Sequence, residues 1–553
     1  MGAPSVSCEG FINVLERTKR AGLAGIRGPD SRSEYDSRLG RASQSKHLRT
    51  TTRMRNRHRR GGTDSGKQAI GDSRRMALEF QAAVQALLQA HPAQSAARLL
   101  PDGLEAFAVR THSMRLAQRS LDVQTYIWHD DATGRYIVRE LVRAADRGVH
   151  VRVLLDDMDA RPRDVTLATL DRHPRIDVRM FNPFRTRSGI LRTLAELSQR
   201  GSRLNHRMHN KAWIMDAQLA VVGGRNIGDE YFASSAELNF IDLDVLLLGP
   251  AVAQAQHEFE RYWNSPLAKR VSRLAKYKRA ILNTRRLRAS LEASARQAAS
   301  ERFGAAVAAQ DSLQAIVDPG FIWSTNVRVI ADDPQKALGR EGRRSSKVLD
   351  SMIAEIEATT RRLQMVSPYF VPGIGATVTL RSLARQGTEV AILTNSLSAT
   401  DVAAVHSGYA RYRLPLLEAG VRLYEMKLSP VFEDGHTRFR LGSSRGSLHT
   451  KAVVLDGERV FVGSFNIDPR SSNLNCEMGV WIRSRALASE LEESFASGID
   501  PLRAYSLVAE NSRLTWIEQL DGVEVRHTHE PHAGLWRRFI TRLLERLPIE
   551  SQL

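Results

Sequence analysis

In the segment "LHTKAVVLDGERVFVGSFNIDPR", residues 448–470, the polar residues 449–451 are followed by two short apolar runs. His449 and Lys451 stand two residues apart, and the pair Asp456-Gly457 separates the two apolar runs. Because side chains i and i+2 of a strand project from one face, His449 and Lys451 are expected to point to the same side. Asp-Gly is a preferred pair for a tight hairpin turn. The segment therefore predicts a β-hairpin that presents an imidazole beside an ammonium group.

The same pattern occurs a second time in "HNKAWIMDAQLAVVGGRN", residues 209–226. In both copies Lys, Asp, Gly and Asn follow the histidine at offsets of 2, 7, 14 and 17 residues. The members are His209, Lys211, Asp216, Gly223 and Asn226 in the first copy, and His449, Lys451, Asp456, Gly463 and Asn466 in the second. One copy of so short a motif carries little information, whereas two copies with matched spacing indicate a duplicated functional unit.

The sequence around each copy also repeats in order. A strand at 120–129 ("SLDVQTYIWH") precedes a helix "GRYIVRELVRAADRG" and a strand "VHVRVLLDD", and 361–372 ("RRLQMVSPYFVP") precedes "ATVTLRSLARQG" and "TEVAILTN". These are two βαβ units. The predicted fold class is α/β, with two related halves, each a mixed sheet flanked by helices, packed with pseudo-twofold symmetry around one active site.

The predicted domain borders follow from composition. We expect a basic, disordered extension at 1–75, an N-terminal half at 76–265, a charged helical connector at 266–314 and a C-terminal half at 315–553. The extension holds 17 Lys and Arg against 7 Asp and Glu, so it carries much of the net charge of +19. Three interpretations of it stay open: a basic arm for nucleic acid or anionic lipid, a solvated tail, or translation from upstream of a true start at Met76.

Composition also excludes several classes of protein. With only two cysteines, Cys8 and Cys476, the chain offers neither a disulfide framework nor a cysteine-based zinc site. No apolar run approaches the ~20 residues of a membrane-spanning helix, and the first residues lack a signal-peptide pattern. The expectation is a protein that is neither integral to a membrane nor exported by a signal peptide.

The repeated residues suit phosphodiester chemistry. An imidazole beside an ammonium, with a glycine-rich turn and an asparagine amide, can bind a tetrahedral oxyanion. Two histidines from opposite halves can flank one phosphorus atom, one attacking it and the other protonating the leaving oxygen. The charge of the phosphodiester would then be met by Lys211, Lys451 and the amides of Asn226 and Asn466.

A nucleophilic imidazole needs a carboxylate on its other ring nitrogen. Asp242 lies 33 residues after His209, and Glu477 lies 28 residues after His449, so these two are the candidates for orienting the histidines. Asp244 shares a strand face with Asp242 and stays open as an alternative.

Asp216 and Asp456 belong to the motif, and we keep them in the catalytic group. Their place in the predicted hairpin turns favours shaping the turn or pairing locally over direct chemistry.

At these residues the sequence resembles the phospholipase D superfamily, and within it the bacterial cardiolipin synthase branch. The similar stretches are "RMHNKAWIMD", "VVGGRNIGDEYF", "SPYFVP", "ILTNSL", "DVAAVHSGYARYR", "SLHTKAVVLD" and "FVGSFNIDPRS", and the resemblance runs from about residue 80 to the C-terminus. It implies a covalent phosphatidyl-histidine, and the superfamily's usual order favours His209 as nucleophile and His449 as acid, while the near-symmetry of the pair leaves the reverse assignment open. One departure is Gly224, which stands where the second copy has Ser464, so a hydroxyl contact to phosphate is expected from Ser464 alone.

The expected function is therefore a phosphatidyltransferase that makes cardiolipin from phosphatidylglycerol and a second phospholipid, for example phosphatidylethanolamine. The resemblance implies no metal or other cofactor, and activity in the presence of a chelator is expected. A phospholipase D hydrolase is the alternative, followed by a nuclease of the same fold. Nucleic acid is not an expected partner, because the motif strands lack interleaved basic and aromatic residues. The sequence indicates no particular protein partner.

The expected location is peripheral, on an anionic membrane surface at the cytoplasmic side of the bacterial inner membrane. The segment "GLWRRFITRLLERLP", residues 534–548, predicts a basic amphipathic helix with flanking arginines. Its apolar face either lies in a lipid interface or packs on the domain. The apolar positions are Trp536, Phe539, Ile540, Leu543, Leu544 and Leu547, and the arginines are Arg537, Arg538, Arg542 and Arg546. His406 either lines the cleft or fills the core, and it is not placed in the catalytic group.

Overall fold

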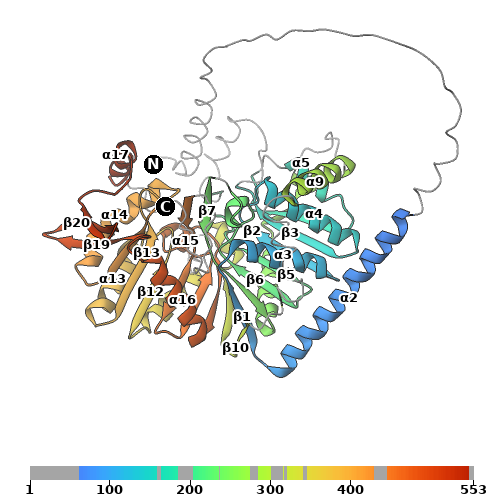
Figure 1. Ribbon diagram of the computed structural model, residues 1–553, viewed down its shortest axis with the longest axis horizontal. Helices are drawn as coiled ribbons and strands as arrows, with labels where there is room; N and C mark the ends of the chain where they lie inside the picture. The colour runs from blue at the N-terminus through green and yellow to red at the C-terminus, as the bar shows by residue number, and fades with distance from the viewer. Residues whose placement is uncertain are drawn as a thin grey trace, which may run out of the picture.

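The computed structural model describes residues 61–158, 164–184, 204–235, 237–274, 284–299, 316, 320–339, 346–428 and 445–546. Two large sheets lie next to each other, each flanked by helices (Figure 1). Both sheets mix parallel and antiparallel pairs. The predicted α/β architecture of two related halves is therefore confirmed.

The first sheet has nine strands in the order β10-β1-β8-β6-β5-β2-β3-β4-β9. Its strands are β1 Ser95–Leu100, β2 Ser120–Thr125, β3 His150–Asp156, β4 Ile176–Phe181, β5 Ala212–Met215, β6 Leu219–Gly223, β8 Asp244–Leu248, β9 Ala268–Arg270 and β10 Ile322–Ser324. The helices of this half are α2 Gly61–Ala90, α3 Gly103–Leu116, α4 Ala132–Asp146, α5 Asp164–Leu170, η2 Asp229–Tyr231, α7 Pro250–Trp263, α8 Val271–Leu274 and α9 Thr284–Ala299.

The second sheet has ten strands in the order β11-β18-β17-β16-β12-β13-β14-β19-β20-β21. Its strands are β11 Val327–Ala331, β12 Arg362–Val366, β13 Glu389–Asn395, β14 Arg422–Met426, β16 Ala452–Leu455, β17 Arg459–Gly463, β18 Met478–Arg483, β19 Ala504–Glu510, β20 Arg513–Leu520 and β21 Val523–His527. The helices are η4 Pro334–Leu338, α12 Lys347–Glu357, α13 Gly373–Arg385, α14 Ala403–Leu417, α15 Pro469–Asn473, α16 Arg485–Gly498 and α17 Leu535–Leu544.

Each half contains the predicted βαβ unit and the predicted motif hairpin. Strands β2 and β3 pair in parallel around α4, and β12 and β13 pair in parallel around α13. The hairpins are β5–β6 and β16–β17. Their turns hold Asp216 and Ala217 at φ 51° and 55°, and Asp456 and Gly457 at φ 55° and 69°. Two successive left-handed residues are the signature of the hairpin turn that the Asp-Gly pair predicts.

The halves share one apolar core between their sheets. Val222 on β6 and Val462 on β17 belong to the same buried cluster, which also takes residues from α7 and α16. A third, two-stranded sheet joins the halves directly, because β7 Leu238–Ile241 of the first half pairs in parallel with β15 Arg445–Leu448 of the second. This shared packing fixes the position of each motif relative to the other.

Two predicted domain borders are wrong. The stretch read as a solvated connector instead packs on the first half: β9 pairs with β4, Leu291 on α9 is buried, and Arg288 pairs with Asp146 on α4 at 2.6 Å. The border at 315 also fails, because β10 still pairs with β1 of the first sheet. The charged composition of α9 hid an apolar stripe that faces α4.

The predicted extension also ends earlier than expected. The helix α2 spans Gly61–Ala90, so the border after residue 75 falls inside a helix. Ala77, Phe80 and Val84 bury the second half of α2 against the first domain, and extending a helix that is already anchored costs little. The remainder of the predicted extension, residues 1–60, lies outside the described residues.

Across the residues that the structure describes, we find no helix that combines the length and the apolar character needed to cross a bilayer.

Candidate active site

The segment that carries each motif histidine is hydrogen-bonded to the opposite half. The amide of His209 donates to the carbonyl of Cys476 at 2.8 Å, and the amide of Cys476 donates to the carbonyl of Arg207 at 2.8 Å. In the other direction, the amide of His449 donates to the carbonyl of Ile241 at 2.8 Å. Equivalent contacts in both directions are what a pseudo-twofold arrangement produces.

Each histidine segment is also held by the parallel sheet of its own half. At the end of β3, Asp156 accepts from the amide of Met208 at 2.9 Å. At the end of β13, Asn395 donates to the carbonyl of Leu448 at 2.9 Å and accepts from its amide at 3.1 Å. The residue before each histidine is therefore fixed by the last residue of a central strand.

Each of the two candidate orienting carboxylates binds the histidine of the opposite half. Nδ1–H of His209 donates to Oε2 of Glu477 at 2.9 Å, and Nδ1–H of His449 donates to Oδ2 of Asp242 at 2.5 Å. The sequence spacing counted each carboxylate from the histidine of its own repeat, but each contact runs to the histidine of the other repeat. Both rings keep Nε2 for contact with a substrate, as in a catalytic triad.

Asp244, the alternative to Asp242, binds arginines instead. Its carboxylate accepts from Arg110 at 2.8 Å and lies 3.4 Å from Arg225. In the strand register Asp244 pairs with Gly223, and it follows Asp242 by two residues in the sequence. The structure therefore gives Asp242, and not Asp244, contact with a motif histidine.

Ser464, predicted to bind phosphate, is turned toward a carboxylate. Its hydroxyl donates to Glu477 at 2.5 Å and accepts from the amide of Met478 at 3.0 Å. Gly224 is its counterpart, because a Cβ there would lie 2.1 Å from Oδ1 of Asp242. The shorter Asp242 needs that space, whereas the longer Glu477 leaves room for a serine that holds it. The difference between Gly224 and Ser464 is therefore explained by the different lengths of the carboxylate side chains, Asp242 and Glu477, that they contact.

Both lysines of the motif are buried beside their histidines. Nζ of Lys211 donates to the carbonyl of His209 at 2.8 Å, and Nζ of Lys451 donates to the carbonyl of His449. Lys451 also lies 3.0 Å from Nδ1 of His449. Because Nδ1–H of His449 already donates its hydrogen bond to Asp242, the ammonium of Lys451 affects this nitrogen only as a nearby charge.

The two motif asparagines differ in what they already bind. Oδ1 of Asn226 accepts from the amide of Ile127 at 3.1 Å, and its Nδ2 donates to the hydroxyl of Tyr231 at 2.9 Å. Oδ1 of Asn466 is buried without a hydrogen-bond partner. An amide oxygen accepts and cannot donate to a phosphoryl oxygen, so only the Nδ2 group of Asn466 could bind a phosphate.

The motif aspartates lie at the hairpin turns and not with the histidines. Asp216 accepts from the amides of Gln118, Arg119 and Ser120, and so ties its hairpin to the start of β2. In the second half, Asp456 accepts from the amides of Arg361 and Arg362 at the start of β12. Their inclusion in the catalytic group is corrected by this geometry, since backbone donors occupy both carboxylates.

A family model described as "Cardiolipin synthase, PLD-like domain" matches residues 111–263 and 352–499, one segment for each motif copy. The chain belongs to this cardiolipin synthase family of phospholipase D-like enzymes. The expected family and enzyme class, a phosphatidyltransferase of the phospholipase D superfamily, are thereby confirmed.

Individual proteins agree with this membership. Cardiolipin synthase C of Escherichia coli (strain K12) is 40% identical over 475 residues, which cover 85% of this chain and 98% of that protein. A cardiolipin synthase of Listeria monocytogenes is 24% identical over 77% of this chain and 73% of its own length. The crystal structure of phosphatidylserine synthase from Haemophilus influenzae Rd KW20 shares the fold, with a TM-score of 0.53 and 13% identity over 83% of this chain and 95% of that chain.

Aromatic side chains that the sequence reading missed surround the histidines of this cardiolipin synthase family member. Tyr126 lies edge-on to His209 with ring centres 5.0 Å apart, and Tyr231 lies edge-on to His449 at 5.3 Å. Phe240 lies 5.0 Å from His449. Tyr126 stands three residues before His129, at the end of the predicted strand, but an aromatic residue in a strand is ordinary and gave no signal of this contact.

Burial dominates the electrostatics of the site. It lowers the pKa of His209 to about 4, and it lowers the pKa of His449, with Lys451 adding to the effect. Burial likewise lowers the pKa of Lys211 to about 7 and that of Lys451 to about 8. At pH 7 the site therefore holds neutral imidazoles, a Lys451 that is mostly charged and a Lys211 near its midpoint, whose charge a bound anion would favour.

His406, left out of the catalytic group, contacts neither motif histidine through any ring contact that the described residues show. It is buried on α14 and lies edge-on to Tyr409 with ring centres 5.6 Å apart. Burial lowers its pKa well below the usual range, so it is neutral at pH 7.

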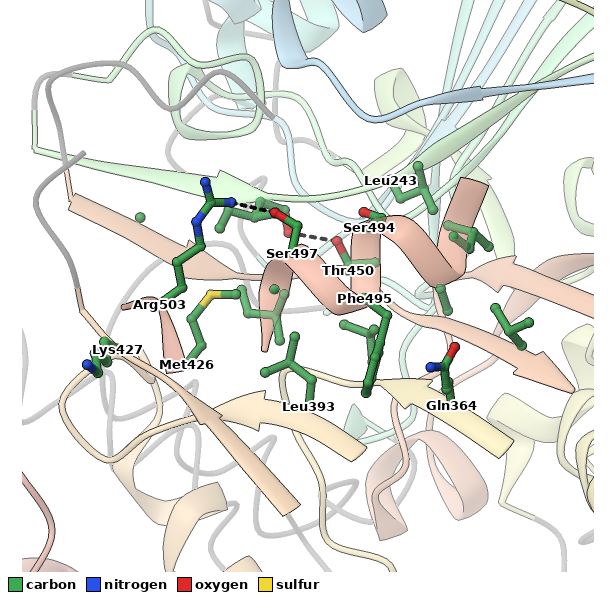
Figure 2. Close-up of a pocket in the computed structure, with 18 residues that line it drawn as sticks. Leu243, Gln364, Leu393, Met426, Lys427, Thr450, Ser494, Phe495, Ser497 and Arg503 are labelled. Atoms are coloured by element: carbon green, nitrogen blue, oxygen red, sulfur yellow. Dashed lines mark hydrogen bonds between the residues drawn. The ribbon is translucent and has the colours of Figure 1, made fainter. Parts of the chain in front are cut away.

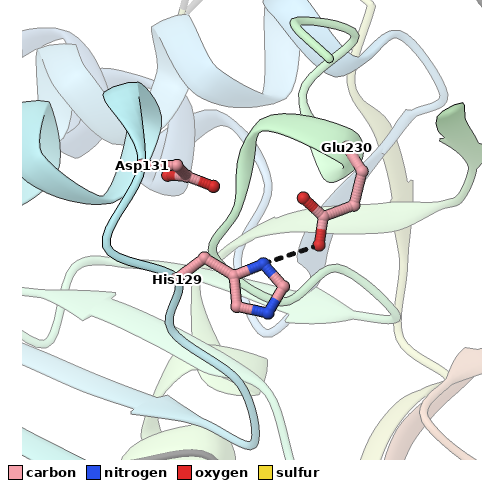
Figure 3. A group of neighbouring side chains, drawn as sticks. All are labelled: His129, Asp131 and Glu230. Carbon is pink, nitrogen blue, oxygen red and sulfur yellow. Dashed lines mark ion pairs between the residues drawn. The ribbon is translucent and has the colours of Figure 1, made fainter. Parts of the chain in front are cut away.

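One group of side chains has the composition of a metal site. His129, Asp131 and Glu230 bring potential ligand atoms within 4.8 Å of one another (Figure 3). Glu230 lies far along the sequence from His129 and Asp131, so spacing did not reveal the group. Nδ1 of His129 pairs with Glu230 at 2.8 Å, and Asp131 accepts from the amides of Gly134 and Asp229. Because these contacts already explain the cluster, we assign it no ion.

Proposed function

We propose that the chain makes cardiolipin by transferring a phosphatidyl group from a donor phospholipid, either phosphatidylglycerol or phosphatidylethanolamine, to the glycerol hydroxyl of phosphatidylglycerol, through a covalent phosphatidyl-histidine. The observation that carries this proposal is the crossed pairing of His209 with Glu477 and of His449 with Asp242. Two imidazoles oriented in this way supply one nucleophile and one acid–base group, which is what a two-step displacement at phosphorus requires.

In the first step, Nε2 of His209 attacks phosphorus. A P–N bond forms and the bond from phosphorus to the head-group oxygen breaks, while His449 delivers its Nε2 proton to that oxygen. The low pKa of His209, caused by burial, keeps its lone pair available. Asp242, at 2.5 Å from Nδ1, stabilises His449 as the imidazolium once the anionic substrate is present.

In the second step, the hydroxyl of the acceptor lipid gives its proton to Nε2 of His449 and its oxygen attacks phosphorus. The P–N bond breaks and His209 is released. Lys211 and Lys451 meet the charge of the phosphoryl oxygens in both steps, together with the amide of Asn466. Both histidines are nearly buried, at 8% and 6% exposure, which limits the access of water that would otherwise hydrolyse the intermediate.

The product of the reaction tests this proposal. Purified protein is incubated with labelled phosphatidylglycerol, with and without phosphatidylethanolamine, and products are identified by mass. Cardiolipin together with free glycerol is the expected result, and ethanolamine release would identify phosphatidylethanolamine as the donor. Phosphatidic acid without cardiolipin would contradict transfer and indicate a hydrolase, and DNA cleavage without lipid turnover would indicate a nuclease.

The pH dependence of kcat/KM should show two limbs. Activity falls below a pKa of about 4, because protonated His209 cannot attack. It falls again on the alkaline side, as His449, whose pKa is lowered by burial, loses the proton that the leaving oxygen needs, and as Lys211 and Lys451, with pKa values of about 7 and 8, lose the charge that binds the anion. In a Lys211→Arg variant the alkaline limb should move up, since a guanidinium stays charged. An alkaline limb that is unchanged in that variant would contradict the role of Lys211.

The helix α17 supports attachment to an anionic membrane. Part of the predicted apolar face is exposed, because Leu535, Trp536, Phe539 and Leu543 are 82%, 66%, 57% and 52% exposed, whereas Ile540 and Leu544 are partly buried. The opposite side faces the protein, where Thr541 is buried. The helix stands at the outer end of the second half (Figure 1). An exposed apolar stripe beside arginines suits the boundary between lipid headgroups and acyl chains.

Removing two aromatic side chains from α17 should weaken membrane binding. A Trp536→Ala, Phe539→Ala variant is expected to bind vesicles containing phosphatidylglycerol about 10- to 100-fold less tightly, from the apolar area withdrawn from the lipid. Co-sedimentation with vesicles measures this. The matched control is Ile374→Ala, a comparably exposed apolar residue on α13. Equal loss in the control, or none in the double variant, would contradict a specific role for α17.

A further inference from the structure

A short turn, residues 395–400, follows β13 and is closed by its own backbone. The amides of Ala399 and Thr400 both donate to the carbonyl of Ser396, at 3.1 and 2.9 Å. All three of these residues are buried. Because buried, close-packed segments are stiff, a contact made on one part of this turn is felt at its other parts.

The turn supports the strand that leads to His449. The hydroxyl of Ser447 on β15 donates to the carbonyl of Ala399 at 3.0 Å. The side chain of Asn395 binds both backbone groups of Leu448. The two residues before His449 are therefore tied to the turn by these three hydrogen bonds.

The same strand is less firmly packed from behind. Leu448 and Thr450, the neighbours of His449, line an apolar pocket together with Leu393 and Phe495 (Figure 2). A wall that borders a pocket has fewer packing contacts than one inside a filled core. The position of His449 thus depends the more on its hydrogen-bonded supports, among them the turn.

The turn also contacts α17. The guanidinium of Arg537 donates to the carbonyl of Thr400. Arg537 is half-buried, whereas Trp536 and Phe539 of the same helix are exposed. The helix α17 lies beside α14, which follows the turn in the chain (Figure 1). One helix therefore presents its apolar stripe outward and an arginine to the turn that supports His449.

The first half supports its histidine in another way. Arg207 stands two residues before His209, as Ser447 stands two residues before His449. Arg207 is fully buried and donates to Asp156 of its own half at 2.8 Å. The cation that supports the first histidine segment thus belongs to that segment, whereas in the second half an arginine reaches the support from α17.

We propose that Arg537 is a positioning residue for His449 and acts through the turn 395–400. Its contact with the turn sets how well the imidazole of His449 is aligned with the leaving oxygen, and it leaves the anchors of His209 in the first half unchanged. The inference rests on the proposed function, in which His449 is the acid and His209 the nucleophile. Alignment of this kind matters because a small misplacement of a catalytic group costs much of the rate.

Two leaving groups test this role. Arg537→Gln should lower kcat for release of the lipid head group, glycerol or ethanolamine, about tenfold, the size expected for one lost hydrogen bond to a charged group. KM should stay nearly constant, because an acid acts only in the transition state. The burst with a phosphatidyl p-nitrophenol, which needs no acid, should keep the wild-type rate. A loss in both assays, or in neither, would overturn the positioning role.

The same assays separate this inference from the proposed function. Head-group release occurs in transfer and in hydrolysis alike, so the effect of Arg537→Gln is visible even if the product is phosphatidic acid. A His449→Ala protein without a burst would contradict the proposed roles of the histidines. A His449→Ala protein with a normal burst, together with unchanged head-group release by Arg537→Gln, would overturn the inference alone.

Arg542→Gln is the matched control. It removes the same charge from the same helix, but Arg542 is exposed, so a loss through weaker attachment to lipid appears in both variants. Only the excess loss in Arg537→Gln measures the contact with Thr400. Arg537→Lys should recover most of the lost rate, since an ammonium can still donate to that carbonyl. Equal losses in the two glutamine variants would overturn the proposal.

A double-variant cycle tests the route through the turn. Ser447→Ala removes the hydroxyl that binds the turn, so it should also slow head-group release and spare the burst. Because both side chains act through one turn, Ser447→Ala combined with Arg537→Gln should lose little more than the larger single loss. Losses that multiply would show that the two side chains act separately and would overturn the route.

Discussion

Replacing His209 by alanine is expected to lower kcat/KM for phosphatidyl transfer by about 10⁴- to 10⁶-fold, the range seen when a member of a covalent catalytic unit is removed. The side chain supplies the attacking nitrogen, so no other described group in contact with Glu477 can replace it. His449→Ala should be similarly inactive with phosphatidylglycerol, because the leaving oxygen then has no acid. The matched control is His257→Ala, an exposed histidine on α7, which should retain full activity.

An activated substrate separates the roles of the two histidines. With a phosphatidyl p-nitrophenol, whose leaving group needs no proton, His449→Ala should release one equivalent of nitrophenolate and stall with the phosphatidyl group on His209. Mass spectrometry of the trapped peptide locates the adduct. An adduct on His449 in the His209→Ala variant would reverse the assignment, and substantial turnover of phosphatidylglycerol by either single variant would contradict a site shared by the two halves.

Glu477→Gln should give the second largest loss, about 10³- to 10⁴-fold in kcat, by analogy with the triad aspartate whose amide fixes the wrong tautomer. The substitution keeps the shape of the side chain but removes the carboxylate that accepts from Nδ1 of His209. Burst kinetics with the activated substrate report the first step directly. A matched control is Glu493→Gln on the exposed side of α16, which should leave the burst unchanged.

The crossed pairing is tested by combining variants. In a His449→Ala background, Asp242 has already lost its imidazole partner, so Asp242→Asn should change the burst little, whereas Glu477→Gln should still slow it. The opposite pattern would mean that each carboxylate serves the histidine of its own repeat.

Much of the fold was predictable because it depends on local pattern. The alternation of apolar residues gave the βαβ units, and the pairs Asp216-Ala217 and Asp456-Gly457 predicted turns that the structure forms with positive φ at both positions. Charged composition misled the reading of α9, because the few residues of its apolar stripe, such as Leu291, decide where it packs. The helical spacing from Met76 onward was recognised, but the start of α2 before that residue was missed, because its composition placed it in the basic extension.

The sequence alone determined the list of chemical groups. Matched spacing singled out His209, Lys211, His449 and Lys451, and the position of Asp242 and Glu477 before apolar strands marked them as orienting candidates. Only the tertiary structure decided which carboxylate meets which histidine, that Ser464 serves Glu477, and that aromatic rings enclose the imidazoles. The physical reason is that side chain spacing along a strand fixes only the face to which a group points. The partner across the interface is fixed by the packing of two halves, through contacts such as β7 on β15, that are far apart in the chain.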